Sequence, residues 1–119
     1  MTAGYWRDVP AQPMTMAGAR DVTRRVLISP QDGWDGWVMR AFELAPGGHT
    51  PRHAHKWPHI NVGLEGSGIV EIDGVEHPLR GGSYAFVPPG SVHQFRNTGT
   101  GPMGIICIVP LEGDPQVAD

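Results

Sequence analysis

The sequence predicts an all-β protein, an antiparallel sandwich or barrel formed by a single domain. Short runs rich in β-branched and aromatic residues recur at a spacing of roughly 8 to 12 residues, which is typical of such folds. Turn residues separate these runs, because the 119-residue chain holds 17 Gly and 12 Pro. No window keeps apolar residues at helical spacing over several turns without a Gly or Pro, so helix is at most a minor component.

The predicted strands follow one another along most of the chain. Their ranges are 24–28, 37–44, 59–65, 67–72, 83–88, 91–95 and 103–110. Asp73 and Gly74 form a two-residue hairpin signal directly after one of these runs. We expect residues 1–23 to form an N-terminal arm or an edge strand, residues 24–114 the barrel, and residues 115–119 a C-terminal tail.

Charge and composition argue against several classes of partner. The net charge is −3, and no basic run is longer than Arg24-Arg25, so we expect neither nucleic acid nor a membrane as a partner. The most apolar stretch, 103–111, is too short to span a bilayer, and the single Cys107 cannot close an intramolecular disulfide. These features predict a cytoplasmic protein. Serine hydrolysis and nucleotide chemistry have no support, because their glycine-rich motifs are missing.

Histidines are concentrated in one short segment. Of the 6 in the chain, His53, His55 and His59 lie within "HAHKWPH". On a strand, residues two apart share a face about 6.5–7 Å apart, so His53 and His55 can point at one position. His59 has the same parity, but the chain must bend at Pro58 to bring it back to that position. Converging imidazoles would bind a divalent transition metal; the alternative is that these are surface or satisfied core histidines.

The glycines around these histidines resemble the two motifs of the cupin superfamily. From Gly47 the chain reads G-x5-H-x-H-x3-H-x6-G, and from Gly82 it reads G-x5-P-x-G-x2-H-x3-N. The first motif usually has Glu where this chain has His59, and the second matches at every fixed position. The intervening residues 67–81 are similar to the short spacer of compact bacterial cupins.

The resemblance implies a double-stranded β-helix, or jelly-roll barrel, with a metal held by His53, His55, His59 and His93. Four neutral imidazoles leave the full charge on the metal, which becomes more electrophilic and harder to oxidise. Over residues 20–114 the chain is similar to small single-domain four-histidine bacterial cupins of the manganese type. That group implies a homodimer and one divalent transition metal per chain, with Mn or Fe first and Cu, Ni or Zn as alternatives.

Further residues are expected around the metal. We predict a substrate pocket lined by Arg40, Phe42, Trp57, Phe95, Ile105, Cys107 and Val109. Arg40 is a cation on the more apolar face of its strand, where it either orients an anionic or phenolic substrate or forms a rim salt bridge. By resemblance the Cys107 face of the last strand lines the cavity, with the thiol as an oxidisable neighbour of the metal or as a small core residue. His49 and His77 are expected on the surface.

The expected function is that of an oxidoreductase of the dioxygenase type. Dioxygen or peroxide would meet a small apolar or aromatic substrate, such as an alkene, phenol or diketone, at the metal. One alternative is a non-redox isomerase or lyase in which the metal acts as a Lewis acid on a carbonyl. The other is a module that binds a small ligand without turnover.

Overall fold

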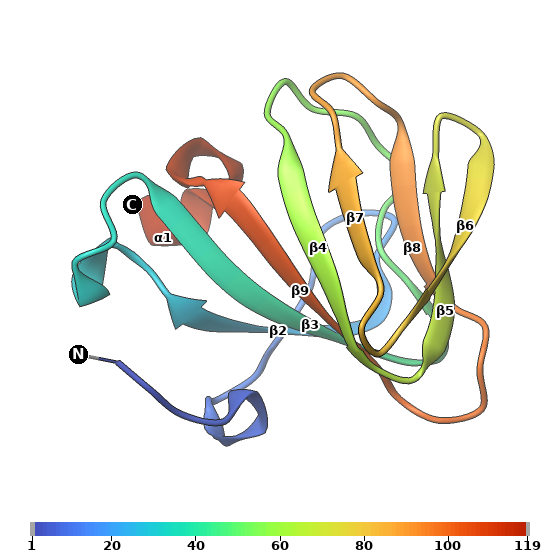
Figure 1. The fold of residues 1–119 in the computed structure, drawn as a ribbon, viewed down its shortest axis with the longest axis horizontal. Helices are drawn as coiled ribbons and strands as arrows, with labels where there is room; N and C mark the ends of the chain where they lie inside the picture. The colour runs from blue at the N-terminus through green and yellow to red at the C-terminus, as the bar shows by residue number, and fades with distance from the viewer. Residues whose placement is uncertain (1, 119) are drawn as a thin grey trace.

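The computed structural model describes residues 2–118, which form a curved antiparallel sheet with a few short helical turns (Figure 1). The strands are β1 (Gln12–Pro13), β2 (Arg20–Ile28), β3 (Trp37–His49), β4 (His59–Glu65), β5 (Ser67–Ile72), β6 (Val75–Arg80), β7 (Tyr84–Val87), β8 (His93–Asn97) and β9 (Met103–Pro110). The helical elements are η1 (Trp6–Asp8), η2 (Pro30–Asp32), η3 (Leu111–Gly113) and α1 (Pro115–Ala118). Within the described residues, none of these helices has the length and apolar character needed to cross a membrane.

The strands form a nearly closed barrel around the long strand β3. Their order is β6-β5-β8-β3-β9-β4-β7, while β2 pairs with the other edge of β3 and β1 pairs with β2. β3 pairs with β9 along residues 37–44 and then with β8 at His49. It therefore joins β9, β4 and β7 to β8, β5 and β6. The predicted all-β barrel is confirmed.

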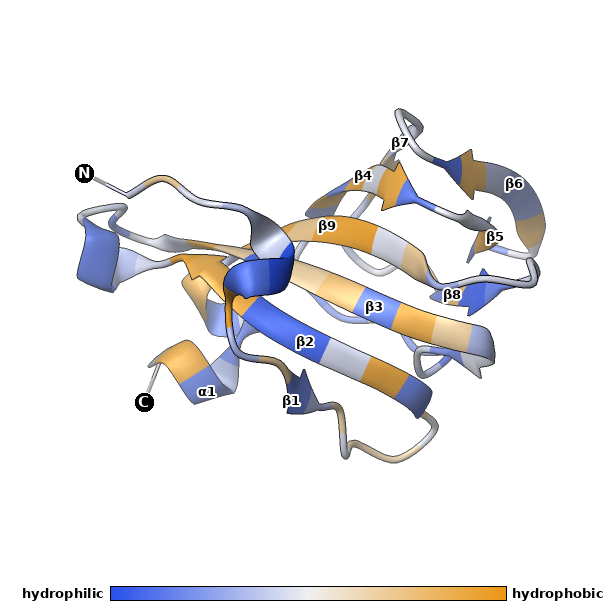
Figure 2. Cartoon of the chain, turned by 90° about the horizontal axis from the view of Figure 1, so that it is seen from below, coloured by the Kyte–Doolittle hydropathy of each residue, from blue (hydrophilic) through white to orange (hydrophobic). Residues whose placement is uncertain are grey.

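The core lies between these two groups of strands. Val38 and Leu44 on β3 are completely buried, and so is Ile105 on β9. They pack in one cluster with Val70 of β5 and Leu79 of β6. Both faces of β9 are apolar, and Figure 2 shows most of this strand in hydrophobic colours. Removal of these side chains from water, at about 25 cal/mol per Å² of apolar surface, is the main term that holds the barrel together.

Several strands differ from the predicted ranges, among them β2 and β6. β2 begins at Arg20, which pairs with His49 past an irregularity at Asp21, a residue with a left-handed φ of 53°. β6 was not predicted, since "VEHPLR" mixes charged residues with a proline. It forms because Asp73 and Gly74, with φ of 50° and 84°, close the predicted two-residue turn and pair β6 with β5.

The segment before β4 is not a strand. His53 forms only an isolated bridge with His93, and residues 54–58 are bend and coil. The strand geometry used to argue that His53 and His55 share a face is therefore absent from this segment. Pro51 and Pro58 explain the difference, because a proline has no backbone N–H to donate to a strand ladder.

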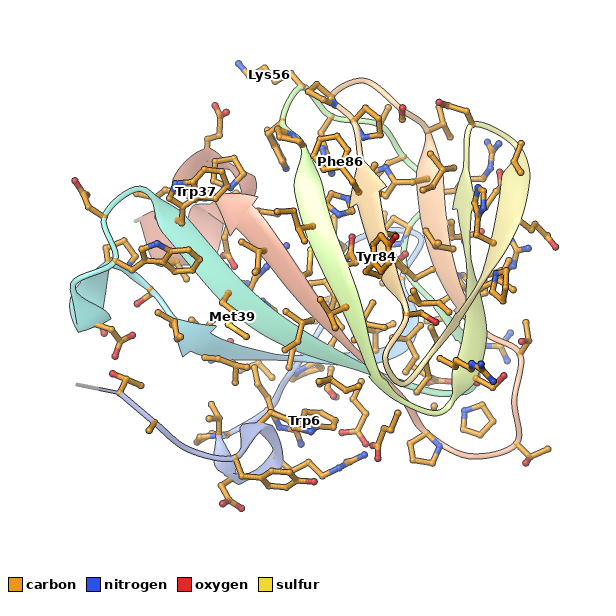
Figure 3. The ribbon with its side chains drawn as sticks, in the orientation of Figure 1. Trp6, Trp37, Met39, Lys56, Tyr84 and Phe86 are labelled. Carbon is orange, nitrogen blue, oxygen red and sulfur yellow. The ribbon has the colours of Figure 1, made fainter. Side chains whose placement is uncertain are left out.

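The N-terminal arm packs against the barrel of its own chain. β1 pairs with β2, and Gln12 lies opposite Arg24. Arg7 forms ion pairs with Glu43 and Glu65, one on each of two barrel strands. These contacts hold residues 6–13 against the barrel, and Figure 3 shows Trp6 among the side chains of this region.

Candidate metal centre

Backbone pairing brings four histidines from separate parts of the chain together. His59 is the first residue of β4, and His93 is the first residue of β8. The backbone N of His53 donates to the carbonyl of His93 at 3.1 Å, and the reverse bond is 2.9 Å long. The carbonyl of His55 accepts from the N–H of Gly90 at 2.7 Å. The loop that carries His53 and His55 is thereby fixed to the start of β8.

The four imidazoles converge. Ring nitrogens of His53, His55 and His93 lie within 4.8 Å of one another. The Nε2 atoms of His59 and His93 are 3.0 Å apart, and the ring centroids of His55 and His59 are 5.3 Å apart. His59 and His93 are only 3% and 2% exposed, whereas His53 and His55 are half-buried. The structure thus places side by side all four histidines that the sequence proposes as ligands.

Backbone carbonyls fix the orientation of two of these rings. Nδ1 of His93 donates to the Ser91 carbonyl at 2.9 Å, and Nδ1 of His55 donates to the Trp57 carbonyl at 2.9 Å. A carbonyl oxygen can only accept, so Nδ1 carries the proton in both rings. In the neutral imidazole this leaves a free lone pair on Nε2, the atom that faces the other histidines.

Asn61 fixes the ring of His59 in the same way. Asn61 is fully buried, and its Nδ2 donates to the Ile106 carbonyl at 3.2 Å. Its Oδ1 must then face Nδ1 of His59, 2.6 Å away, and accept a hydrogen bond from the ring N–H. The sequence prediction missed Asn61. A signal was present, because Asn61 lies two residues after His59 on a strand and so shares its inward face.

The arrangement of nitrogens fits a metal ion. Two lone pairs that face each other across 3.0 Å repel unless a cation lies between them. Nitrogens about 2.1 Å from a shared ion and at right angles are themselves about 3.0 Å apart. Burial lowers the pKa of His53, His59 and His93 to about 4, so the rings are neutral at pH 7 and ready to bind metal. A set of neutral imidazoles suits a divalent transition metal.

The histidines line a cavity of about 550 Å³. Five of the predicted pocket residues also line it, namely Arg40, Phe42, Trp57, Phe95 and Cys107. Ile105 and Val109 are buried in the core and are not among the lining residues. Trp57 stacks on His55 with ring centroids 4.5 Å apart and an angle of 10° between the planes. The indole of Trp57 thus holds the ring of His55 in place.

Both ends of the chain supply the remaining walls, which sequence reasoning did not place at the site. The N-terminal arm contributes Pro13, Met14, Thr15 and Met16, and the C-terminal segment contributes Gly113, Asp114, Pro115 and Gln116. Asp114 is 2% exposed, forms an ion pair with Arg24 of β2, and lies 3.5 Å from Nη1 of Arg40. The residues after β9 therefore fold back onto the barrel and form part of the cavity wall.

The two remaining histidines lie outside the cluster. His77 is exposed on β6, as predicted. The surface position predicted for His49 is wrong, because His49 is half-buried where the end of β3 pairs with Arg96 of β8. Its Nδ1 lies 3.2 Å from the Thr50 carbonyl. Neither histidine lines the cavity.

Known proteins resemble this chain in sequence and in fold. A family model described as a cupin domain matches residues 40–109. The dimethylsulfoniopropionate lyase DddW of Ruegeria pomeroyi is 35% identical over 107 residues, which cover 82% of this chain and 66% of the lyase. The 1-methylthio-D-xylulose 5-phosphate methylsulfurylase of Rhodospirillum rubrum is 34% identical over 99 residues, 82% of this chain and 62% of the relative. This chain thus spans just under two thirds of each relative.

A solved structure supports the same relationship. The polyketide cyclase RemF of Streptomyces resistomycificus superimposes with a TM-score of 0.84 and 32% sequence identity. The match covers 92% of this chain and 79% of the cyclase.

Proposed function

Because this protein belongs to the cupin family, we propose that it is a metal-dependent enzyme that acts on a small organic molecule inside its barrel. The observation that carries the proposal is the facing pair of His59 and His93, whose Nε2 atoms are 3.0 Å apart beside a cavity of about 550 Å³. His53 and His55 complete the ligand set. Each chain holds one divalent transition metal, Mn or Fe first, with Cu, Ni or Zn as alternatives.

Side chains around the four histidines orient the substrate and keep the metal ligands in position. A metal in this set would supply a Lewis acid and, if redox-active, electrons for dioxygen or peroxide. Phe42 and Phe95 supply apolar walls that exclude water and orient an apolar or aromatic part of the substrate. Asn61 keeps the proton of His59 on Nδ1, so that Nε2 stays free for the metal.

Of the two reaction classes expected from the sequence, the non-redox class now has the stronger support. The four imidazoles bring no negative charge, which favours a strongly electrophilic ion that resists oxidation. Two of the relatives are named as a lyase and a methylsulfurylase, and the similar structure as a cyclase. We therefore place a lyase or isomerase, with the metal as Lewis acid, before the dioxygenase-type oxidoreductase.

The dioxygenase remains the second candidate, on a specific observation. The cavity has aromatic walls and a thiol, Cys107, in its lining, and these surroundings suit an apolar substrate that reacts with dioxygen or peroxide. A binding module without turnover is the third outcome. Alkenes, phenols and diketones test the second candidate, and substrates that undergo elimination, such as dimethylsulfoniopropionate, test the first.

Exchange of the metal separates these candidates. The protein is loaded with zinc, which has no redox chemistry, or with manganese or iron, and product formation is measured with and without oxygen. Turnover by the zinc form under anaerobic conditions supports the non-redox enzyme. Turnover only with manganese or iron, coupled to oxidant uptake, supports the dioxygenase instead. If every metal form binds ligands but none turns over, both enzyme proposals are contradicted.

A further inference from the structure

The cavity wall carries an excess of positive charge before any metal binds. Among the described residues, its lining includes Arg24 and Arg40 but only one acidic residue, Asp114. The side chains of these three residues are 8%, 11% and 2% exposed, respectively. Burial of a charge without a partner is costly in free energy. Because two guanidinium groups share one carboxylate, one of them needs a further anion.

Arg24 already has its partners. Its Nη2 donates to Oδ2 of Asp114, and its Nη1 faces the side-chain oxygens of Gln12 and Gln116. These acceptors come from the N-terminal arm and from the C-terminal segment. Arg24 thus serves to hold both ends of the chain against β2.

Arg40 is the guanidinium with donors to spare. Its Nη1 lies 3.5 Å from Asp114, which is longer than the roughly 2.7–2.9 Å of a charge-assisted hydrogen bond. Its Nη2 meets the sulfur of Cys107 at 3.1 Å, and a thiol is a weak acceptor. Its Nε is buried and has no hydrogen-bond partner within residues 2–118. A guanidinium presents its N–H groups as a planar fork that matches a carboxylate or a phosphate.

The position of Arg40 suits contact with a ligand that also reaches the histidines. Its guanidinium carbon lies 4.8 Å from the ring centroid of Phe42, so the aromatic face holds the group in place. Arg40, His55 and His59 all line the same cavity. The remaining lining near them includes Phe95, which is apolar.

We propose that Arg40 binds the carboxylate of the substrate, so that the enzyme acts on small organic carboxylates with an apolar body. This inference rests on the proposed function and narrows its substrate class. A carboxylate held by Arg40 directs the rest of the molecule along the apolar walls toward the histidine cluster. The aromatic lining favours a carboxylate on a hydrocarbon body over a phosphate ester or inorganic phosphate.

Calorimetric titration with matched probes tests this assignment. Cinnamate and cinnamamide have the same apolar body and differ in charge, and phenyl phosphate and inorganic phosphate serve as competing anions. Both the zinc-loaded and the metal-free protein are titrated, so that binding to the metal is separated from binding to Arg40. We expect cinnamate to bind at least about 10-fold more tightly than cinnamamide in both forms, because a hydrogen bond to a charged group is worth that much.

Two variants complete the experiment. Arg40→Gln should abolish the preference for cinnamate while the metal content stays unchanged. Arg52→Gln should keep it, because Arg52 is 55% exposed and lies outside the cavity lining. If Arg40→Gln does not fold, Arg40→Lys replaces it. The comparison of cinnamate with cinnamamide on the wild-type protein tests the inference as well, because it needs no variant.

Three results overturn the inference. These are equal affinity for acid and amide, a carboxylate preference found only with metal bound, and tighter binding of phenyl phosphate than of cinnamate. None of these readouts needs turnover. A protein that prefers cinnamate through Arg40 but never turns over would contradict the proposed function and leave the assignment of Arg40 as a carboxylate-binding residue standing.

Discussion

His59 and His93 face each other with their Nε2 atoms 3.0 Å apart, while the Nδ1 of each ring donates to an acceptor supplied by the chain. The acceptors are the amide oxygen of Asn61 and the carbonyl of Ser91. Each ring is therefore held with its lone pair toward the other. Such a pair is stable only with a cation between the nitrogens, which makes it the part of the site most specific for metal.

Asn61 is predicted to set metal affinity. Asn61→Ala leaves Nδ1 of His59 without its acceptor, so the ring can rotate or move its proton to Nε2. We expect the affinity for Zn or Mn to fall by about 10- to 100-fold, as measured by competition with a chelator. Asn61→Asp, which keeps the acceptor oxygen, should retain the affinity. If Asn61→Ala lowers thermal stability but not metal affinity, Asn61 has only a structural role.

Asp114 is predicted to hold the C-terminal segment onto the barrel. Asp114→Asn removes the anionic partner of Arg24 and leaves two buried guanidinium groups without a carboxylate. The free energy of unfolding, measured with urea, should fall by about 3–5 kcal/mol. Glu112→Gln is the control, because Glu112 is exposed and should shift stability by less than about 0.5 kcal/mol. An equal, small effect of both changes would show that the ion pair contributes little.

The metal-free protein is predicted to lose stability on mild acidification. Burial lowers the pKa of His53, His59 and His93 from 6.5 to about 4, so below pH 6.5 the unfolded chain binds more protons than the folded one. The stability is complete above pH 6.5 and falls as the pH drops toward 4. Urea midpoints across this range measure the effect. A midpoint that rises on acidification would refute the assignment.

The homodimer expected from the sequence is predicted to form through the outer face of β7, β4, β9 and β3. Phe86, Ile60, Ile108 and Met39 lie opposite one another across these strands, with no charged side chain between them. Figure 3 shows Met39 on β3 and Phe86 on β7, and Phe86 and Ile60 are 57% and 45% exposed. An uncharged apolar row of this kind suits a self-complementary contact with a second copy of the chain.

Light scattering coupled to size-exclusion chromatography checks this interface. The wild type should have the mass of a dimer, and Phe86→Glu should have that of a monomer. Val75→Glu is a matched control, because Val75 is 56% exposed but lies on β6, away from the row. A monomeric wild type, or a dimer that Phe86→Glu leaves intact, would contradict the prediction.

The strands could be predicted because glycines, prolines and β-branched runs mark their ends locally. The four ligand positions followed from the resemblance of the segments that begin at Gly47 and Gly82 to the two cupin motifs. The structure brings His59, at the start of β4, close to His93, at the start of β8. The irregular loop was missed because strand parity assumes a ladder that the prolines at 51 and 58 prevent. His53 and His55 still point at the other histidines, because the backbone bridge between His53 and His93 positions the loop.

The cavity walls were harder to predict than the ligands. Arg24 and Asp114 are 90 residues apart, and no local pattern indicates that the segment after β9 returns to β2. Nothing in the sequence distinguishes Asp114 from a solvated acidic residue near a chain end. Ile105 and Cys107 have the same parity on β9, but of the two only Cys107 lines the cavity, whereas Ile105 is completely buried in the core.

Metal content is the most direct test of the central claim. Protein purified without an affinity tag is analysed for its elements, beside His93→Ala and the control His77→Ala, whose histidine is exposed and outside the cluster. We expect about one equivalent of a divalent transition metal per chain in the wild type and in His77→Ala, and a clear loss in His93→Ala. If the wild type stays free of metal after reconstitution at neutral pH, or if His93→Ala binds as much as the wild type, the histidine cluster is not a metal centre.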